Sequence, residues 1–145
     1  TLFRSRYASK QRLFVFKQLN LGNQEEAPII ASSWFISSEI GNPIIVLTRN
    51  LLYAYWQDYD YLLNYFTFHL FFTMACRRYE NEWESIPAFN NSSPHMLMFE
   101  LKKDYSAERW EQIMKMSGIH KLQRYDDYRD LKKSNYCKIL DTYLQ

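Results

Sequence analysis

The segment Gly-Ile-His-Lys-Leu gives the clearest indication of chemistry in this sequence. His120 and Lys121 lie next to each other, shortly after Gly118. An imidazole is a good ligand for Mn²⁺ or another divalent ion, and a lysine ammonium binds a diphosphate well. On a strand the two side chains would point to opposite faces, whereas on a loop both could reach one ligand. The pair therefore indicates a metal-assisted phosphate site, with an ordinary surface histidine as the alternative.

The two other histidines lie in different surroundings. His69 falls in the most apolar stretch of the chain, with Tyr65 four residues earlier on the same helical face. It fits a catalytic imidazole or, more commonly, a buried histidine satisfied by one hydrogen bond. His95 follows an Asn-Ser-Ser-Pro segment and could contact a polar substrate or simply begin a strand. Neither histidine identifies a reaction by itself.

Familiar catalytic motifs do not occur in the sequence. There is no G-x-S-x-G, Walker loop, zinc-ligand spacing or dinucleotide fingerprint. Cys76 and Cys137 lack metal-site spacing, which favours free thiols in a reducing compartment. The residue types alone leave the class of enzyme open.

The composition is that of a globular protein with many aromatic residues. The 145 residues are 47% hydrophobic and 23% charged, and 18% are aromatic. Tyrosine and tryptophan suit sugar-binding clefts as well as cores and partner interfaces. The net charge is +2 without a basic block, which argues against a nucleic-acid partner.

Three helices are expected to position the candidate side chains. Asn42 as N-cap and Pro43 at the first helical position predict a helix to about Gln57. A second helix, apolar almost all round, is expected at 62–76 and should be central. A third is predicted at 107–116, capped by Ser106 or Asp104 and ended by a left-handed glycine at 118.

The other elements are expected to be mostly extended. Strands are predicted at 13–16, 28–36 and 96–101, and a loop at 80–94. A charged amphipathic helix is predicted at 126–145. These elements indicate a mixed α/β chain with more helix than strand.

Neither the start of the chain nor its most apolar stretch has the pattern of a membrane-inserted segment. The first 17 residues show no signal-peptide pattern. The apolar stretch at 61–76 is shorter than the roughly 20 residues of a spanning helix, so a buried helix is expected, with membrane contact as the alternative. The start at Thr1 without a helix cap favours a fragment, which should expose apolar surface and form homo-oligomers or be poorly soluble.

Five segments follow one another in an order that is similar to a known family. They lie at 34–43 (WFISSEIGNP), 55–56 (YW), 63–69 (LNYFTFH), 93–97 (SPHML) and 117–122 (SGIHKL). Together they resemble the C-terminal half of the capsular polysaccharide synthesis protein family, bacterial glycosyltransferases related to the DXD-containing sugar transferases. The resemblance covers about residues 1–125, and the tail has no recognised counterpart.

The resemblance implies an α/β, helix-rich C-terminal portion of a GT-A-like nucleotide-diphospho-sugar transferase fold. In such families an Asp-x-Asp motif holds a divalent metal, Mn²⁺ or Mg²⁺, on the sugar diphosphate. The run Thr1-Leu2-Phe3 is similar to the residues that follow this motif, so the motif is expected just upstream and the chain alone is expected to be inactive. Residues 1–125 would supply the acceptor side and the closing metal ligand, and residues 126–145 a helical tail.

The resemblance also implies roles for particular residues. His120 would complete the metal shell, while Asn64 and His69 would face the sugar cleft as catalytic residues. Substrate contacts are expected from four residues: Lys121, Trp34, Ser37 and His95. The family often has Asp at position 64, and the Asn found here can orient a sugar hydroxyl but cannot act as a general base.

The implied function is transfer of a sugar from a nucleotide-sugar donor to a growing capsular or surface polysaccharide. The implied location is the cytoplasm, at the inner face of the membrane if there is peripheral membrane contact. The alternative is a helical interaction module or a peripheral membrane module without catalysis, supported by the aromatic stretch at 61–76 and the amphipathic tail.

Overall fold

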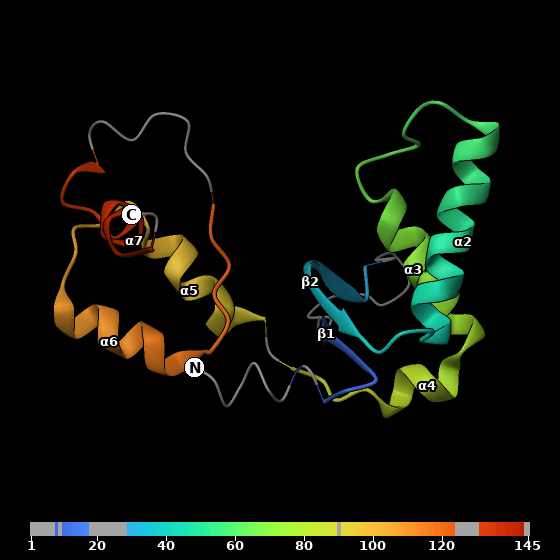
Figure 1. Ribbon diagram of the computed structural model, residues 1–145, viewed down its shortest axis with the longest axis horizontal. Helices are drawn as coiled ribbons and strands as arrows, with labels where there is room; N and C mark the ends of the chain where they lie inside the picture. Colours follow the sequence, from blue (N-terminus) through green and yellow to red (C-terminus); the bar gives the residue numbers. More distant parts are fainter. Residues whose placement is uncertain (1–7, 9, 18–28, 90, 124–130, 144–145) are drawn as a thin grey trace. The chain divides into compact units, whose positions relative to one another are not determined.

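The computed structural model describes residues 8, 10–17, 29–89, 91–123 and 131–143. These residues fall into two compact units, one within Tyr7–Asn90 and one within Asn91–Gln145. We call them the N-terminal unit and the C-terminal unit. Each has its own apolar core. Figure 1 shows the helices and strands of both units.

The described residues of the N-terminal unit include a two-stranded sheet and the helices α2, α3 and α4. Strands β1 (Leu13–Lys17) and β2 (Ala31–Ser38) pair antiparallel, with a register shift between Val15 and Phe16. Its helices are α2 (Pro43–Asp58), α3 (Thr67–Arg78) and the short α4 (Glu80–Ser85). The core of this unit joins side chains from both strands, from α2 and α3, and from the residue that follows α4: Leu13, Val15, Ala31, Ile44, Phe72, Ala75, Cys76 and Ile86.

The predicted start of α2 is confirmed. The Asn42 side chain accepts hydrogen bonds from the backbone N–H groups of Ile44 (3.2 Å) and Ile45 (3.4 Å). Gly41 has a φ of 80°, a left-handed conformation that glycine adopts without strain. The buried Asn42 amide also donates to the Arg12 carbonyl and to Glu82, so the same residue ties β1 and α4 to the start of α2.

Helix α3 begins later than predicted. Residues 59–66 form an irregular turn, and Leu62 and Leu63 are exposed in it. The rest of the prediction is confirmed, because Phe72 and Ala75 of α3 lie in the centre of the core. Cys76 is buried beside them, and burial raises the pKa of its thiol to about 12.

In the described residues, the C-terminal unit has three helices: α5 (Ser92–Glu100), α6 (Ala107–Met116) and α7 (Asn135–Tyr143). Leu97, Leu101 and Ile113 form its core. The prediction of α6 is confirmed, including the Ser106 cap, whose hydroxyl accepts from the Arg109 N–H.

Several expectations for this half of the chain were wrong. Residues 96–101 are not a strand but belong to α5 and the turn after it, because Leu97, Glu100 and Leu101 are buried with helical spacing. The expected loop at 80–94 contains α4 and the start of α5. Among the described glycines only Gly41 has a positive φ, so Gly118 is not the left-handed stop.

The predicted tail helix is shorter than expected where it can be compared. Helix α7 begins at Asn135, after a turn at 131–134, and residues 124–130 lie outside the described residues. Residue 28, the expected start of the second strand, also lies outside them. Overall, the mixed, helix-rich class is confirmed, and the likeness to a GT-A fold stays a prediction, as does the division into residues 1–125 and 126–145.

Candidate functional site

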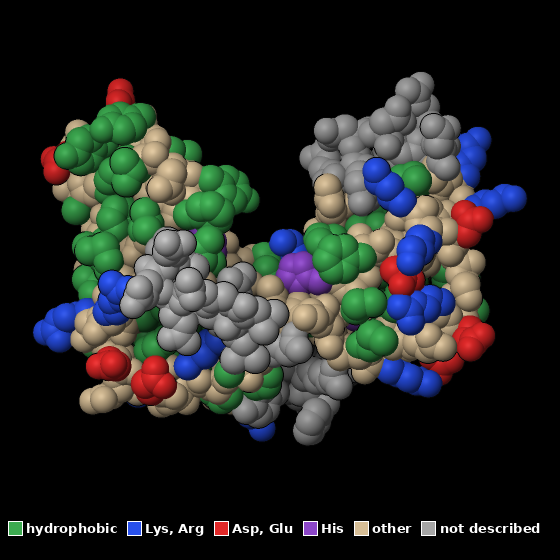
Figure 2. All heavy atoms as spheres, turned by 180° about the vertical axis from the view of Figure 1, so that it is seen from behind, with side chains coloured by type: hydrophobic (Ala, Val, Ile, Leu, Met, Phe, Trp, Pro, Cys, Tyr) green, Lys and Arg blue, Asp and Glu red, His purple; other side chains and the backbone are tan. Residues whose placement is uncertain are grey.

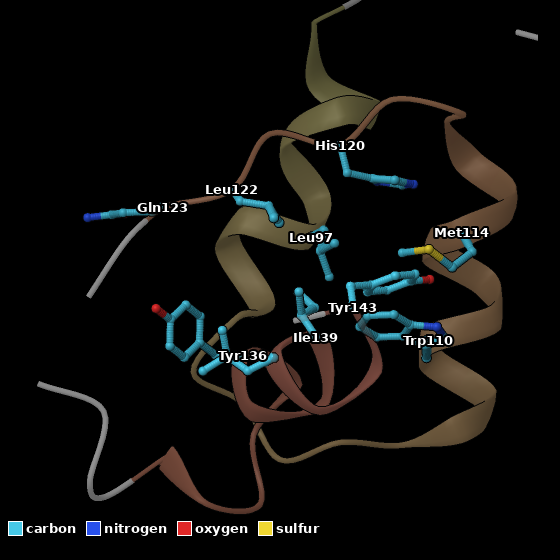
Figure 3. Close-up of a pocket in the computed structure, with 10 residues that line it drawn as sticks. Leu97, Trp110, Met114, His120, Leu122, Gln123, Tyr136, Ile139 and Tyr143 are labelled. Carbon is cyan, nitrogen blue, oxygen red and sulfur yellow. The ribbon is translucent and has the colours of Figure 1, made fainter. Parts of the chain in front are cut away.

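A cavity of about 560 Å³ lies within the C-terminal unit, beside His120 (Figure 3). Its walls come from α5, α6, α7 and the segment after α6. Ten residues line it: Leu97, Trp110, Met114, His120, Leu122, Gln123, Tyr136, Ile139, Leu140 and Tyr143. The volume is in the range of ligand pockets, and the lining is mainly apolar and aromatic.

His120 is held in this wall by hydrogen bonds of its neighbours. The Ser117 hydroxyl donates to the Ile119 carbonyl (2.7 Å) and accepts from the Ile119 N–H (3.2 Å). The Lys121 N–H donates to the Pro94 carbonyl (2.9 Å). Both ring nitrogens of His120 are buried. These hydrogen bonds hold the His120 imidazole beside the cavity and out of bulk solvent.

Lys121 does not share this position. It is half-buried and is not among the residues that line the cavity, although its neighbours His120 and Leu122 are. Lys121 therefore lies between two residues that line the cavity without lining it itself. The two residues are close along the chain, but only one of them faces this cavity.

A backbone hydrogen bond places the start of α5, which carries His95, next to the loop that carries His120. The hydrogen bond from Lys121 to Pro94 holds the loop against the start of α5, one residue before His95. The Nδ1 atom of His95 is 2.6 Å from the Asn91 carbonyl, and its ring lies against Phe99. The structure therefore brings together the segments of three predicted site residues, His95, His120 and Lys121.

The described residues do not form a metal centre by themselves. No group of three or more His, Cys, Asp or Glu side chains among them could hold a metal ion. The cavity beside His120 offers mainly carbon atoms, whereas Mn²⁺ and Mg²⁺ prefer oxygen ligands. His120 can supply one ligand at most, and the described part of the chain does not fit a complete site.

The other four predicted residues lie in the N-terminal unit. The Trp34 ring stacks on Phe16 with centroids 5.1 Å apart and planes 10° apart. Ser37 lies opposite Phe14 in the strand ladder. Both are half-buried on β2, so they are available only in part for a substrate contact.

His69 is tied to the sheet. Its ring packs against Phe66 and Phe68, and a hydrogen bond links it to the backbone of Ala31. Burial lowers the pKa of His69, and the hydrogen bond to Ala31 opposes this effect in part. The neutral imidazole is therefore favoured, which fits the interpretation of a buried histidine satisfied by one hydrogen bond.

Asn64 shapes the turn before α3. Its side-chain oxygen accepts from the Phe66 N–H (2.7 Å), and its carbonyl accepts from the Thr67 hydroxyl (2.7 Å). Such a local side-chain bond is typical of an Asx turn. It explains an asparagine at this position without a substrate.

The cavity itself was missed by the sequence analysis. Its signal is present in α7, where the lining residues Tyr136, Ile139, Leu140 and Tyr143 have the spacing of one helical face. The sequence predicts a separate tail helix and assigns no partner to this apolar face. In the structure Tyr136 and Ile139 pack against the core formed by α5 and α6.

Comparison with known proteins gives the class of this chain. Residues 3–140 match the family model described as capsular polysaccharide synthesis protein. The match covers nearly the whole chain, so this chain belongs to that family and has a role in polysaccharide synthesis. It also extends well beyond residue 125, where the resemblance seen in the sequence had ended. No curated protein and no solved structure is significantly similar to the chain.

Proposed function

We propose that this chain takes part in the transfer of a sugar from a nucleotide-sugar donor to a growing capsular or surface polysaccharide. Membership of the capsular polysaccharide synthesis family supports a role in this pathway. The observation that favours a reaction site is His120, which lies in a fixed loop beside a cavity of ligand size.

His120 and Lys121 are the residues on which the proposed chemistry depends. Glycosyl transfer from a nucleotide sugar leaves negative charge on the departing diphosphate, and cationic groups stabilise that charge. In the proposal Lys121 contacts the diphosphate and His95 contacts the substrate from the adjoining start of α5. Trp34 and Ser37 of β2 stay separate proposed substrate contacts of the N-terminal unit, outside this site. Asn64 and His69 receive no catalytic role, because each side chain already has a structural hydrogen bond, Asn64 with the Phe66 N–H and His69 with the backbone of Ala31.

A divalent metal remains part of the proposal. If Mn²⁺ or Mg²⁺ is bound, it would polarise the diphosphate, with His120 as one ligand. The other ligands would have to come from outside the described residues, since these contain no ligand cluster. We therefore derive no step through the metal.

The proposed setting is the cytoplasm, with the inner face of the membrane as the site if there is peripheral membrane contact. We also propose that the chain self-associates, since several large apolar side chains are exposed, including Tyr65 and Phe99.

A transfer assay tests the proposed function. The protein would be purified from its natural host and incubated with UDP-, GDP- and CMP-sugars together with surface polysaccharide from the same host. We expect nucleotide release from one donor class and a matching gain of mass on the saccharide. Nucleotide release without mass gain, or no release from any donor, would contradict the proposal.

A second candidate function is a peripheral membrane module, and the turn between α2 and α3 favours it. Leu62 and Leu63 are about two-thirds exposed there and Tyr65 is 90% exposed. Figure 2 shows hydrophobic side chains gathered over this end of the N-terminal unit. No Lys or Arg occurs from residue 50 to residue 76, so contact would depend on apolar and aromatic insertion and not on anionic lipid. Among the described helices, none combines the length and apolar character needed to cross a bilayer.

Co-sedimentation with phosphatidylcholine vesicles tests this second function. If the turn inserts, the double variant Leu62→Ser and Leu63→Ser should lose most vesicle binding, because two exposed leucines no longer leave water. Ile40→Ser is the matched control, since Ile40 is fully exposed at the other end of α2. Equal binding by both variants and by the wild type would argue against insertion of the turn.

A further inference from the structure

We infer that the cavity beside His120 binds one aliphatic chain, so that the saccharide substrate of the proposed reaction carries an acyl or prenyl group. This inference names the substrate class and rests on the proposed function. Its evidence is the chemistry of the cavity wall.

The wall is aliphatic on several sides. Leu97 of α5, Met114 of α6, Ile139 and Leu140 of α7, and Leu122 of the loop all line the cavity. Figure 3 shows Leu97 and Ile139 close together at its centre and Met114 toward α6. A chain of methylene groups would contact carbon atoms from every one of these elements.

Aromatic rings complete the wall on the side of α6 and α7. Figure 3 shows the rings of Trp110 and Tyr143 near each other, and the ring of Tyr136 on the opposite side. Flat apolar surfaces of this kind suit an extended or branched hydrocarbon. They do not select among acyl and prenyl chains, which share this chemistry.

Few polar groups could bind a free sugar inside the cavity. The polar groups of the lining side chains are the His120 ring nitrogens, the Gln123 amide, the Trp110 N–H and the hydroxyls of Tyr136 and Tyr143. Figure 3 shows the Gln123 amide and the Tyr136 hydroxyl pointing away from the other lining side chains. A sugar ring needs several directed hydrogen bonds, and each hydroxyl buried without one is unfavourable. An aliphatic chain has no such requirement.

The position of His120 links the bound aliphatic chain to the proposed sugar transfer. Its imidazole forms part of the same wall. A substrate with its hydrocarbon in the cavity would therefore bring its polar end to the imidazole and to the start of α5, where the Lys121 N–H is bonded to Pro94. The cavity would act as an anchor that positions a saccharide head group.

Calorimetric titration with alkyl glucosides tests the inference directly. The 145-residue chain would be titrated with glucose and with hexyl, octyl and decyl β-D-glucoside below their micelle concentrations. We expect no binding of glucose and an affinity that rises about fourfold for each added CH₂ until the cavity is full. An affinity independent of chain length, or no binding of any glucoside, would overturn the inference.

Two variants test whether the alkyl chain of the glucoside binds in this cavity. Leu140→Trp fills the cavity and should weaken octyl glucoside binding at least tenfold, whereas Leu62→Trp, on the exposed turn of the other unit, should leave it unchanged. Circular dichroism checks that both variants fold. If both variants and the wild type bind octyl glucoside with equal affinity, the alkyl chain binds outside this cavity and the inference is overturned.

A second measurement does not depend on the folding of Leu140→Trp. A brominated octyl glucoside should quench part of the tryptophan fluorescence of the wild type, and that part should be missing in Trp110→Phe. Unchanged quenching in Trp110→Phe would contradict binding in this cavity. Neither test needs a sugar donor, so a failure here is distinguishable from a failure of the transfer assay.

Discussion

Glu100 is the residue that joins the three helices of the C-terminal unit. Its buried carboxylate accepts from Arg109 of α6 through Nη2 (2.6 Å) and Nε (3.1 Å), and Lys103 lies 3.6 Å away. Its backbone carbonyl accepts from the Asn135 amide of α7 (2.8 Å). The hydrogen bond from Arg109 is the main cause that lowers the pKa of Glu100, against the opposing effect of burial.

This lowered pKa predicts a dependence of stability on pH. The carboxylate contributes its full stabilisation above the ordinary glutamate pKa of about 4.3, and the contribution is lost as the pH falls through the lower pKa of the folded state. Glu100→Gln should therefore lower the free energy of unfolding by about 1–3 kcal/mol at neutral pH, and this difference should shrink in acid. Urea titrations at neutral and acidic pH measure both effects.

Glu111→Gln is the matched control for Glu100→Gln. Glu111 pairs with Lys115 on the exposed face of α6, where both side chains are mostly in water. Such a pair contributes little to stability, so this variant should unfold like the wild type. If the two variants have the same free energy of unfolding at neutral pH, the buried Glu100–Arg109 pair does not stabilise the C-terminal unit as we describe.

At the scale of elements, the N-cap residues of α2 and α6 differ in their burial and in the number of hydrogen bonds that they make. Asn42 is buried and caps α2 while its amide also bonds to Arg12 and Glu82. Ser106 caps α6 with a single contact of 3.4 Å at the exposed surface. We therefore expect Asn42→Ala to destabilise its unit by about 2 kcal/mol and Ser106→Ala by about 0.5 kcal/mol. Urea unfolding of the two variants checks the order, and a larger loss for Ser106→Ala would reverse our account of the caps.

The helices whose starts were predicted correctly begin with an N-cap residue that can be identified in the sequence. The structure of the elements that were predicted wrongly depends on contacts with other parts of the fold. Asn42 with Pro43 fixed the start of α2, and Ser106 fixed the start of α6, because a cap acts over a few residues. Residues 96–101 form too short an apolar run for periodicity to distinguish a strand from a helix. The late start of α3 depends on the Asn64 turn, whose effect is not visible in the apolar pattern.

The same contrast holds for the candidate site. His120 and Lys121 could be selected from residue types, but the sequence could not show that His120 lines a cavity while Lys121 does not. That cavity needs α5, α6 and α7 together, and α7 lies far along the chain from the other two. Contacts of this range are set by tertiary packing, not by local spacing.

At the scale of the whole molecule, the two units have separate cores, and this predicts how a core mutation acts. Ile113 is fully buried in the core of the C-terminal unit. Ile113→Ala should destabilise that unit by about 2–5 kcal/mol, because it removes buried methyl groups and leaves a cavity. Hydrogen exchange should then speed up in α5, α6 and α7 while α2 and α3 stay protected. Loss of protection along the whole chain would mean that the two units unfold as one.

The central claim for the whole molecule is that His120 serves sugar transfer. The most direct measurement is the rate of transfer by protein from the natural host, compared between the wild type, His120→Ala and His69→Ala, with circular dichroism to confirm folding. We expect His120→Ala to lose about a hundredfold in rate, the typical cost of one group that stabilises charge in the transition state. His69→Ala should keep a rate near that of the wild type once folded. Wild-type turnover by folded His120→Ala would contradict the claim.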